Sequence, residues 1–218
     1  MSRMLRTLGA AAAVTALVAL FGSAARADFQ VDPSPGGDSL YINGAQANVS
    51  SLLGSIGSQN SGVLVDINTV ANVDAANGYA TFKPAGADPL TSLLFTPQSP
   101  GLFSDFSFRG QLDSSANGTV VVTVQGYKNG APEAATQSFT FTGLGANTNF
   151  SRIGIDAVPL TDETIQWVRI ESVFKEVKQV NFSSSLTDGP VVPEPAFYQM
   201  ASLLALGGLG ILRLRRRS

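Results

Sequence analysis

Hydrophobic and polar residues alternate with a period of two along much of the chain's middle and second half. Valines at 120, 122 and 124 alternate with Val121, Thr123 and Gln125, and the same pattern returns at 105–109, 138–142 and 153–157. This alternation is typical of half-buried antiparallel strands, whose successive side chains point to opposite faces. A further strand is predicted from Ile165 to Val173, and no convincing amphipathic helix appears between residues 28 and 192.

Turn signals separate these predicted strands. Asn-Gly pairs, which supply the positive φ angles of tight hairpins, occur at 43–44, 77–78, 117–118 and 129–130. The last pair lies between the strands predicted at 120–127 and 137–142, so we expect a hairpin there. Residues 34–38 and 50–62 have the composition of loops. Short strands at this spacing predict an antiparallel two-sheet sandwich or a barrel.

The order of strands from Leu102 to Leu186 resembles the jelly-roll β-sandwich of many exported carbohydrate-binding modules. The resemblance rests on the strand pattern and implies an all-β fold, an antiparallel β-sandwich of jelly-roll type. We expect this domain at residues 28–186, with a linker at 187–192. An N-terminal signal peptide and a single C-terminal membrane helix are expected to flank it.

The N-terminus has the pattern of a secretory signal peptide. Arg3 and Arg6 precede an apolar stretch from Leu8 to Phe21, and Ala25-Arg26-Ala27 follows as an A-x-A cleavage pattern. We therefore expect residues 1–27 to be removed, with cleavage after Ala27.

The C-terminus combines three features in a fixed order. A proline pair around one glutamate comes first, followed by a 17-residue apolar run at 196–212 and then by a cluster of arginines. As a helix the run would span about 25 Å, against about 30 Å of hydrocarbon in a bilayer. Each arginine would cost about 2.5–3.5 kcal/mol at the bilayer centre, so the cluster is expected to stop translocation. These residues are Pro193, Glu194 and Pro195, and Arg213, Arg215, Arg216 and Arg217.

This tail closely resembles the PEP-CTERM sorting signal of Gram-negative bacteria and covers residues 193–218. In that family an exosortase, a membrane protease-transpeptidase, recognises the Pro-Glu-Pro motif, the membrane helix and the arginine cluster. The resemblance implies that Pro193, Glu194 and Pro195 form the recognition element and that the tail is removed near them. A plain membrane anchor with an incidental proline pair is the alternative.

Composition excludes several kinds of chemistry. The chain contains no cysteine and no histidine, which rules out disulfides, Ser-His-Asp and Cys-His catalysis and the usual zinc sites. Between residues 28 and 192, seven Lys and Arg stand against 15 Asp and Glu, a formal charge of −8. An acidic body without a basic patch argues against nucleic acid as a partner.

Trp167 and Arg169 form the most distinctive candidate site of the body. If Val168 and Ile170 face the core, Trp167 and Arg169 face outward together and could form a platform for a sugar ring. If Ile165 and Trp167 face inward instead, Trp167 is a core residue. The sequence leaves both alternatives open.

Carboxylates offer two weaker hypotheses. A glycoside hydrolase would need a pair of them, and the candidates, which include Asp66, Asp105, Asp113 and Glu171, are scattered without a motif. A structural calcium ion is chemically plausible near Asp66, Asn68 and Asp74, although the EF-hand pattern is lacking. No catalytic residue, metal site or cofactor is predicted.

Together these features predict an exported, non-enzymatic surface or extracellular-matrix protein. Its expected partners are the secretion machinery, an exosortase-like membrane protease and polysaccharide. It would be anchored transiently in the inner membrane and then reach the cell surface, the outside of the cell or a biofilm matrix. A carbohydrate-binding module with structural calcium is the second hypothesis, and a carboxylate-dependent hydrolase is the third.

Overall fold

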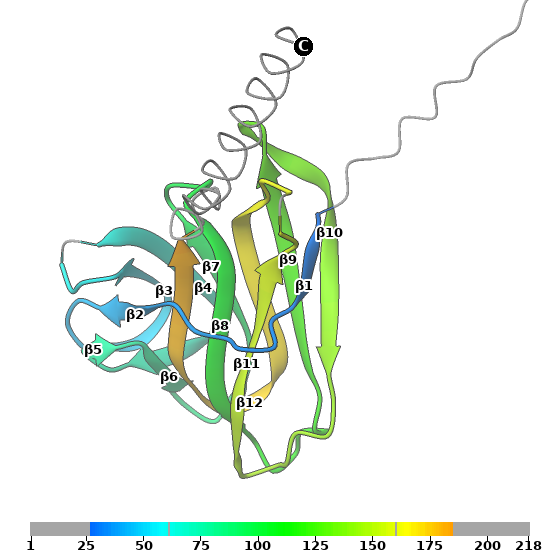
Figure 1. The fold of residues 1–218 in the computed structure, drawn as a ribbon. Coiled ribbons are helices and arrows are strands. Elements are labelled where there is room, and N and C mark those ends of the chain that lie inside the picture. Colours follow the sequence, from blue (N-terminus) through cyan, green and yellow to red (C-terminus); the bar gives the residue numbers. More distant parts are fainter. Residues whose placement is uncertain (1–26, 61, 160, 185–218) are drawn as a thin grey trace, which may run out of the picture.

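A computed structural model describes residues 27–60, 62–159 and 161–184, and this part of the chain is all-β (Figure 1). No helix occurs among these residues, so none there has the length and apolar character that a membrane crossing requires. The predicted signal peptide, the Pro-Glu-Pro motif, the apolar run and the arginine cluster lie outside the described residues, apart from Ala27. The strands are β1 (Phe29–Val31), β2 (Asp38–Ile42), β3 (Gln46–Ile56), β4 (Val63–Ala75), β5 (Gly78–Tyr79), β6 (Thr81–Pro84), β7 (Leu90–Pro97), β8 (Phe103–Leu112), β9 (Val120–Lys128), β10 (Ala131–Phe141), β11 (Asn149–Ala157) and β12 (Thr164–Ser184).

The long strand β12 organises the fold, because both of its edges are paired along most of its 21 residues. One edge pairs with β9 over residues 164–171 and with β8 over residues 174–184. The other edge pairs with β7, then β6, and finally β2. All of these pairings are antiparallel. The strand predicted to end near Val173 therefore continues for about ten more residues into a second set of partners.

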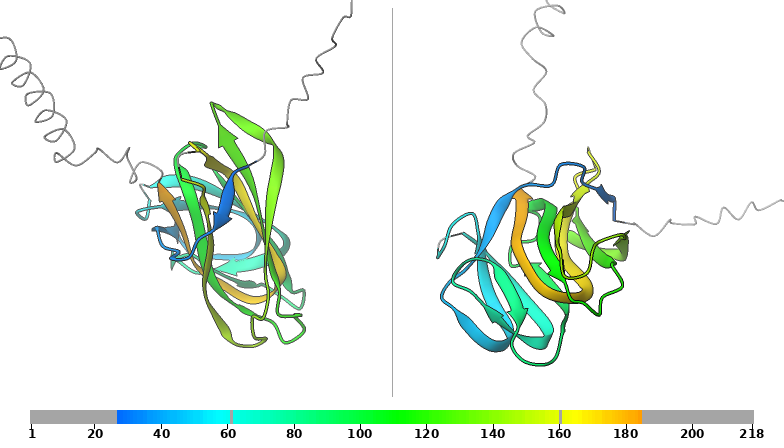
Figure 2. Two further views of the ribbon diagram at one scale, coloured as in Figure 1. Left: turned by 45° about the vertical axis from the view of Figure 1, so that its right-hand side comes forward. Right: turned by 90° about the horizontal axis from the view of Figure 1, so that it is seen from below.

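Hydrogen bonding from β12 through β7, β4, β3 and β2 returns to β12, so these strands close a barrel-like ring. From the opposite edge of β12, two wings extend: β9 continues into β10, and β8 continues into β11 and β1. In Figure 2 the light-blue and cyan strands gather on one side of β12, and the green and yellow strands, together with the dark-blue β1, lie on the other. In the described chain, β12 therefore belongs both to the barrel-like ring and to the sheet that carries the two wings.

The predicted hairpin at 129–130 is confirmed. Lys128 pairs with Ala131, and the two loop residues between them, Asn129 and Gly130, have φ angles of 53° and 80°. Two successive positive φ angles define the tight hairpin turn that matches the natural twist of the strands. An L-residue other than Asn or Asp would be strained at Asn129, and glycine relieves that strain at Gly130.

The core follows the alternation that the sequence predicts. Val120, Val122 and Val124 are fully buried while their neighbours on β9 face outward. Phenylalanine rings from separate strands meet inside, with centroids of Phe95 and Phe106 5.5 Å apart and those of Phe106 and Phe182 5.2 Å apart. Such contacts add about 0.5–1.5 kcal/mol per pair to the burial of apolar area.

The loop predicted at 50–62 is wrong in its first half. Residues 50–56 belong to β3 and pair with β4, and Leu52 and Ile56 are buried. The serines and glycine that suggested a loop, Ser50, Ser51, Ser55 and Gly54, occupy strand positions. Gly54 has a packing reason: a Cβ there would lie 2.8 Å from Cδ1 of Leu40 and 3.0 Å from the carbonyl oxygen of Tyr41.

Candidate functional site

Trp167 and Arg169 face outward from β12. Val168 and Ile170, which alternate with them, are fully buried, while Trp167 and Arg169 are half-buried on the opposite face of the strand. Of the two alternatives that the sequence left open, the structure has the outward one.

The tryptophan ring is held in place by polar contacts on this outer face. Its Nε1–H donates a hydrogen bond of 2.6 Å to Oε1 of Gln125, its neighbour on β9. The Gln125 amide in turn donates to the main-chain carbonyl of Glu133, also at 2.6 Å. The guanidinium carbon of Arg169 lies 5.6 Å from the centroid of the indole, within the range of a cation–π contact.

The neighbouring strands β9, β7 and β4 contribute further residues beside Trp167 and Arg169. Arg169 pairs with Thr123 of β9 on one side and with Leu94 of β7 on the other, and Leu94 pairs with Asn68 of β4. Next to them, Arg169 and Glu171 border an open hollow of about 410 Å³ whose remaining lining is largely Thr, Ser and Asn from β4 and β7. The arrangement offers one aromatic ring, one cation, one carboxylate and a field of hydroxyl and amide groups. It can bind a polar ligand by stacking and hydrogen bonding.

The predicted carboxylates do not come together. Asp66 accepts two hydrogen bonds from the Gln98 amide, at 3.1 and 3.2 Å. Asp113 caps a turn by accepting from the backbone N–H and the hydroxyl of Ser115, which lowers the pKa of its carboxyl. Glu171 is exposed beside Arg169. In the described part of the chain, Asp66 and Asp113 thus accept local hydrogen bonds, and Glu171 is a surface residue.

Asp66, Asn68 and Asp74, the residues near which a structural calcium ion is chemically plausible, do not all come together. Asp66 and Asp74 lie on one strand, eight residues or roughly 25 Å apart at about 3.3 Å per residue. Asp74 instead accepts a hydrogen bond of 2.9 Å from the Asn48 backbone. Among the described residues, no group of three or more acidic side chains could hold a metal ion.

Asp105 has a partner that the sequence did not indicate. Asp156 lies directly opposite it across β8 and β11, and the two carboxyl groups share a hydrogen bond. Burial, the hydrogen bond with Asp156 and the charge of Asp156 together raise the pKa of Asp105 to about 7, and burial is the largest of these causes. Hydroxyl groups of Ser104 and Ser183 act in the opposite direction. The two carboxyls are in direct contact, whereas glycoside hydrolysis requires a separation of about 5 Å or more.

Cations gather on the outer face of β8, β11 and β12. Arg109 pairs in register with Lys178, and both border an open hollow of about 470 Å³. Arg152 donates to the Ser107 hydroxyl at 3.1 Å and to the Gln179 carbonyl at 3.0 Å, and its pKa is lowered by burial and by Arg109. Lys178 is paired with Glu176 at 3.1 Å. The sequence prediction of a body without a basic patch therefore misses a small local one.

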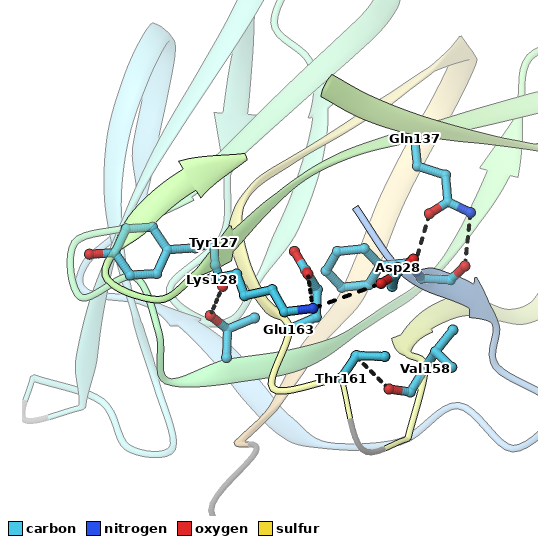
Figure 3. Close-up of polar contacts among 9 residues, drawn as sticks. Asp28, Tyr127, Lys128, Gln137, Val158, Thr161 and Glu163 are labelled. Atoms are coloured by element: carbon cyan, nitrogen blue, oxygen red, sulfur yellow. Dashed lines mark hydrogen bonds and ion pairs between the residues drawn. The ribbon is translucent and has the colours of Figure 1, made fainter. Parts of the chain in front are cut away.

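Buried acidic groups lie at the end of the fold where β1 begins (Figure 3). Glu163, just before β12, is 2% exposed, and neither of its carboxylate oxygens has a hydrogen-bond partner. Lys128 lies 3.9 Å from Glu163 and 3.8 Å from Asp28. Burial, as the largest cause, and the charge of Glu133 together raise the pKa of Glu163 to about 7, against the lowering effect of Lys128. Sequence reasoning could not find this cluster, because its members are far apart in the chain: Asp28, Lys128, Glu133 and Glu163.

Comparisons with known proteins add little to this description. No family model matches the chain, and no curated protein matches it. Among solved structures, the enzymatically active domain of bacteriophage CBA120 tailspike protein 4 aligns with a TM-score of 0.27 and 12% sequence identity. The alignment covers 72% of this chain and 19% of that one, so this chain spans about a fifth of its length. At that TM-score the likeness carries no argument about fold or activity.

Proposed function

We propose that this chain is an exported, non-enzymatic protein of the cell surface or extracellular matrix whose β body binds polysaccharide. Two sequence features support export and sorting: the signal-peptide pattern at residues 1–27 and the Pro-Glu-Pro tail at residues 193–218. In this proposal a signal peptidase cuts after Ala27. An exosortase-like enzyme then processes the tail, after the arginine cluster has held it in the inner membrane. The body would fold as a sandwich of jelly-roll type.

The observation that carries the binding function is the outward Trp167 beside Arg169. Sugar rings have apolar C–H faces that stack on indole and hydroxyl edges that accept and donate hydrogen bonds. Trp167 offers the stacking surface, and the threonine, serine and asparagine side chains of β4 and β7 offer the hydrogen bonds. Arg169 and Glu171 on the same face suit a neutral or uronic-acid glycan, whose hydroxyls and carboxylates can pair with them.

Glycan-array binding of the protein purified from its host tests this function. We expect a defined class of polysaccharide to be bound, and Trp167→Ala to weaken binding at least tenfold while Trp167→Phe retains most of it. Tyr79→Ala is the matched control, because Tyr79 is an exposed aromatic residue (61% exposed) on a different strand. Binding that survives Trp167→Ala in a folded protein would contradict the proposal.

Intact-mass measurement of the protein from its native host tests the processing steps. We expect a chain that starts at Asp28 and has lost residues near Pro193-Glu194-Pro195. A C-terminus that still ends in Arg217-Ser218 would refute tail processing.

A further inference from the structure

The strongest unexplained feature of the molecule is a set of buried carboxylate oxygens without partners. Both oxygens of Glu163 and Oε2 of Glu133 are inaccessible to solvent and accept no hydrogen bond among the described residues. A buried ionised group without a close partner strongly destabilises the folded state, because it has lost its hydration and gained no equivalent interaction. Among the described residues, Lys128 is the cation that pairs with Glu163, at 3.9 Å, and it is shared with Asp28. Within this part of the chain, these oxygens have no closer positive partner.

The start of the body lies beside these oxygens. Ala27 is 2% exposed, and its methyl group shares the space above Gly126 with the Glu163 carboxylate. A Cβ built on Gly126 would lie 1.7 Å from Oε1 of Glu163 and 3.1 Å from the Ala27 methyl. The backbone N–H of Asp28 is directed toward the Glu163 carboxylate and favours its charged form, although the contact falls outside strict hydrogen-bond geometry.

The backbone after Asp28 is fixed in this position. The Asp28 carbonyl accepts from the Val158 N–H at 2.8 Å. Phe29 exchanges two hydrogen bonds with the Gln137 side chain, accepting at 2.8 Å and donating at 2.9 Å (Figure 3). The nitrogen of Asp28 is thus held at the Glu163 carboxylate by contacts that do not depend on the residues before it.

We propose that Glu163 and Glu133 form the binding site for the α-ammonium group that signal-peptide cleavage creates on Asp28. The inference rests on the proposed cleavage after Ala27. Hydrolysis of the Ala27–Asp28 bond consumes one water and leaves a carboxylate on Ala27 and an amine on Asp28, which takes up a proton. The new ammonium has three N–H donors, and three carboxylate oxygens of Glu163 and Glu133 accept no hydrogen bond among the described residues. Loss of Ala27 also empties the space that its methyl group shares with Glu163.

This pairing makes correct N-terminal processing a condition of full stability. In a chain that continues before Asp28, Glu163 is a carboxyl with a raised pKa, so its contribution to stability falls as pH rises from about 4.5 toward 7. In a chain that starts at Asp28, the ammonium lowers the pKa of Glu163 and has its own pKa raised above the usual value of about 7.7–8.0. Its contribution is then present below that usual value and is lost at alkaline pH. Lys128 and Asp28 face the same carboxylate in both chains.

A thermodynamic cycle tests the proposal. Chains running to Ser218 are produced from a removable fusion partner, cut either before Asp28 or before Ser23, each with and without Glu163→Gln, and melted in the same detergent buffer at pH 7.5. In the Asp28 chain we expect E163Q to lower Tm on the order of 5 °C or more. In the Ser23 chain it should leave Tm unchanged or raise it, because it removes a buried charge whose described cationic neighbour, Lys128, lies 3.9 Å away. Asp88→Asn, at an exposed loop position, is the control and should behave alike in both chains.

A second measurement covers the case in which E163Q fails to fold. The α-amino pKa of the unsubstituted Asp28 chain, followed by NMR through the Cα and Hα shifts of isotope-labelled Asp28, should lie above the ordinary range of about 7.7–8.0. An ordinary or lowered α-amino pKa, or an E163Q effect that is equal in the two chains, would overturn the proposal. Both readouts use defined N-termini, so they are independent of where the native host cuts the chain. A host protein that does not start at Asp28 would instead refute the proposed processing.

Discussion

The face around Trp167 and the buried end around Asp28 treat polar groups in opposite ways. On the Trp167 face, polar side chains stand in register across the strands, reach solvent and bond to one another, as Trp167 does with Gln125. At the Asp28 end, Glu163 is removed from solvent and its oxygens accept no hydrogen bond among the described residues. Exposed, hydrogen-bonded groups destabilise the folded state little and remain accessible to a ligand. Buried carboxylates without hydrogen bonds destabilise the folded state strongly, so a new positive charge beside them would stabilise it.

The largest effect on stability is expected from Gly126→Ala, at the buried end. The added methyl would lie 1.7 Å from Oε1 of Glu163 and 2.8 Å from its carboxyl carbon, so the buried side chain must move. We expect a loss of about 2–3 kcal/mol in the free energy of unfolding, measured by urea denaturation. Gly86→Ala is the control, because a Cβ at Gly86 meets nothing within 4 Å. Similar losses in both variants would show that the carboxylate above Gly126 is not tightly held.

The next largest effect on stability is expected at Asp105 and Asp156. In burial they are intermediate between the Trp167 face and the Asp28 end, and they are hydrogen-bonded to each other. The pKa of Asp105, raised to about 7, means that the folded protein holds a proton that the unfolded chain has released above about pH 4. Stability from this group therefore falls as pH rises between about 4 and 7. Asp105→Asn should raise the free energy of unfolding at pH 8 by about 1–2 kcal/mol, a figure reduced because the group is partly solvated.

Melting temperatures at pH 5 and pH 8 check this prediction. The wild-type protein should lose more stability between the two values than the Asp105→Asn variant does. Equal losses would mean that Asp105 is not the proton-holding group.

A smaller effect is expected at the strap that holds β1. Gln137 donates to the Phe29 carbonyl and accepts from its N–H, and β1 has only three residues paired with β11. Gln137→Ala should cost about 1 kcal/mol and should speed hydrogen exchange at the Phe29 amide most. Exchange that rises equally in β9 and β10 would indicate a general loss of stability instead of a local release of β1.

The smallest effect is expected on the Trp167 face. The hydroxyls of Thr123 and Ser138 lie 2.9 Å apart across β9 and β10, at positions open to solvent. Thr123→Val should change the free energy of unfolding by less than about 0.5 kcal/mol, because water replaces the lost bond. A loss above about 1 kcal/mol in urea denaturation would show that the polar groups of this face contribute to stability, contrary to the difference proposed between the two regions.

Local signals in the sequence were sufficient where neighbours in the chain decide the structure. The alternation on β9 predicted which valines are buried, and Asn129-Gly130 predicted the hairpin, because both depend on residues a few positions apart. The loop predicted at residues 50–56 was wrong, because these small polar residues form part of β3 through backbone pairing with β4, which is distant in the local pattern. Local signals also could not find the end of β12, whose second half is held by β8, β6 and β2.

The sequence by itself determined the strand periodicity, the tight turns and the exclusion of histidine and cysteine chemistry, because each follows from residue type and local spacing. Only the tertiary structure decided that Trp167 faces outward with Arg169, since an alternating strand fits either register until its partners fix which face is buried. It alone placed Asp156 against Asp105, and Glu163 and Glu133 beside Asp28. Charges act through space at distances of a few ångströms, and only the folded chain brings residues more than a hundred positions apart that close.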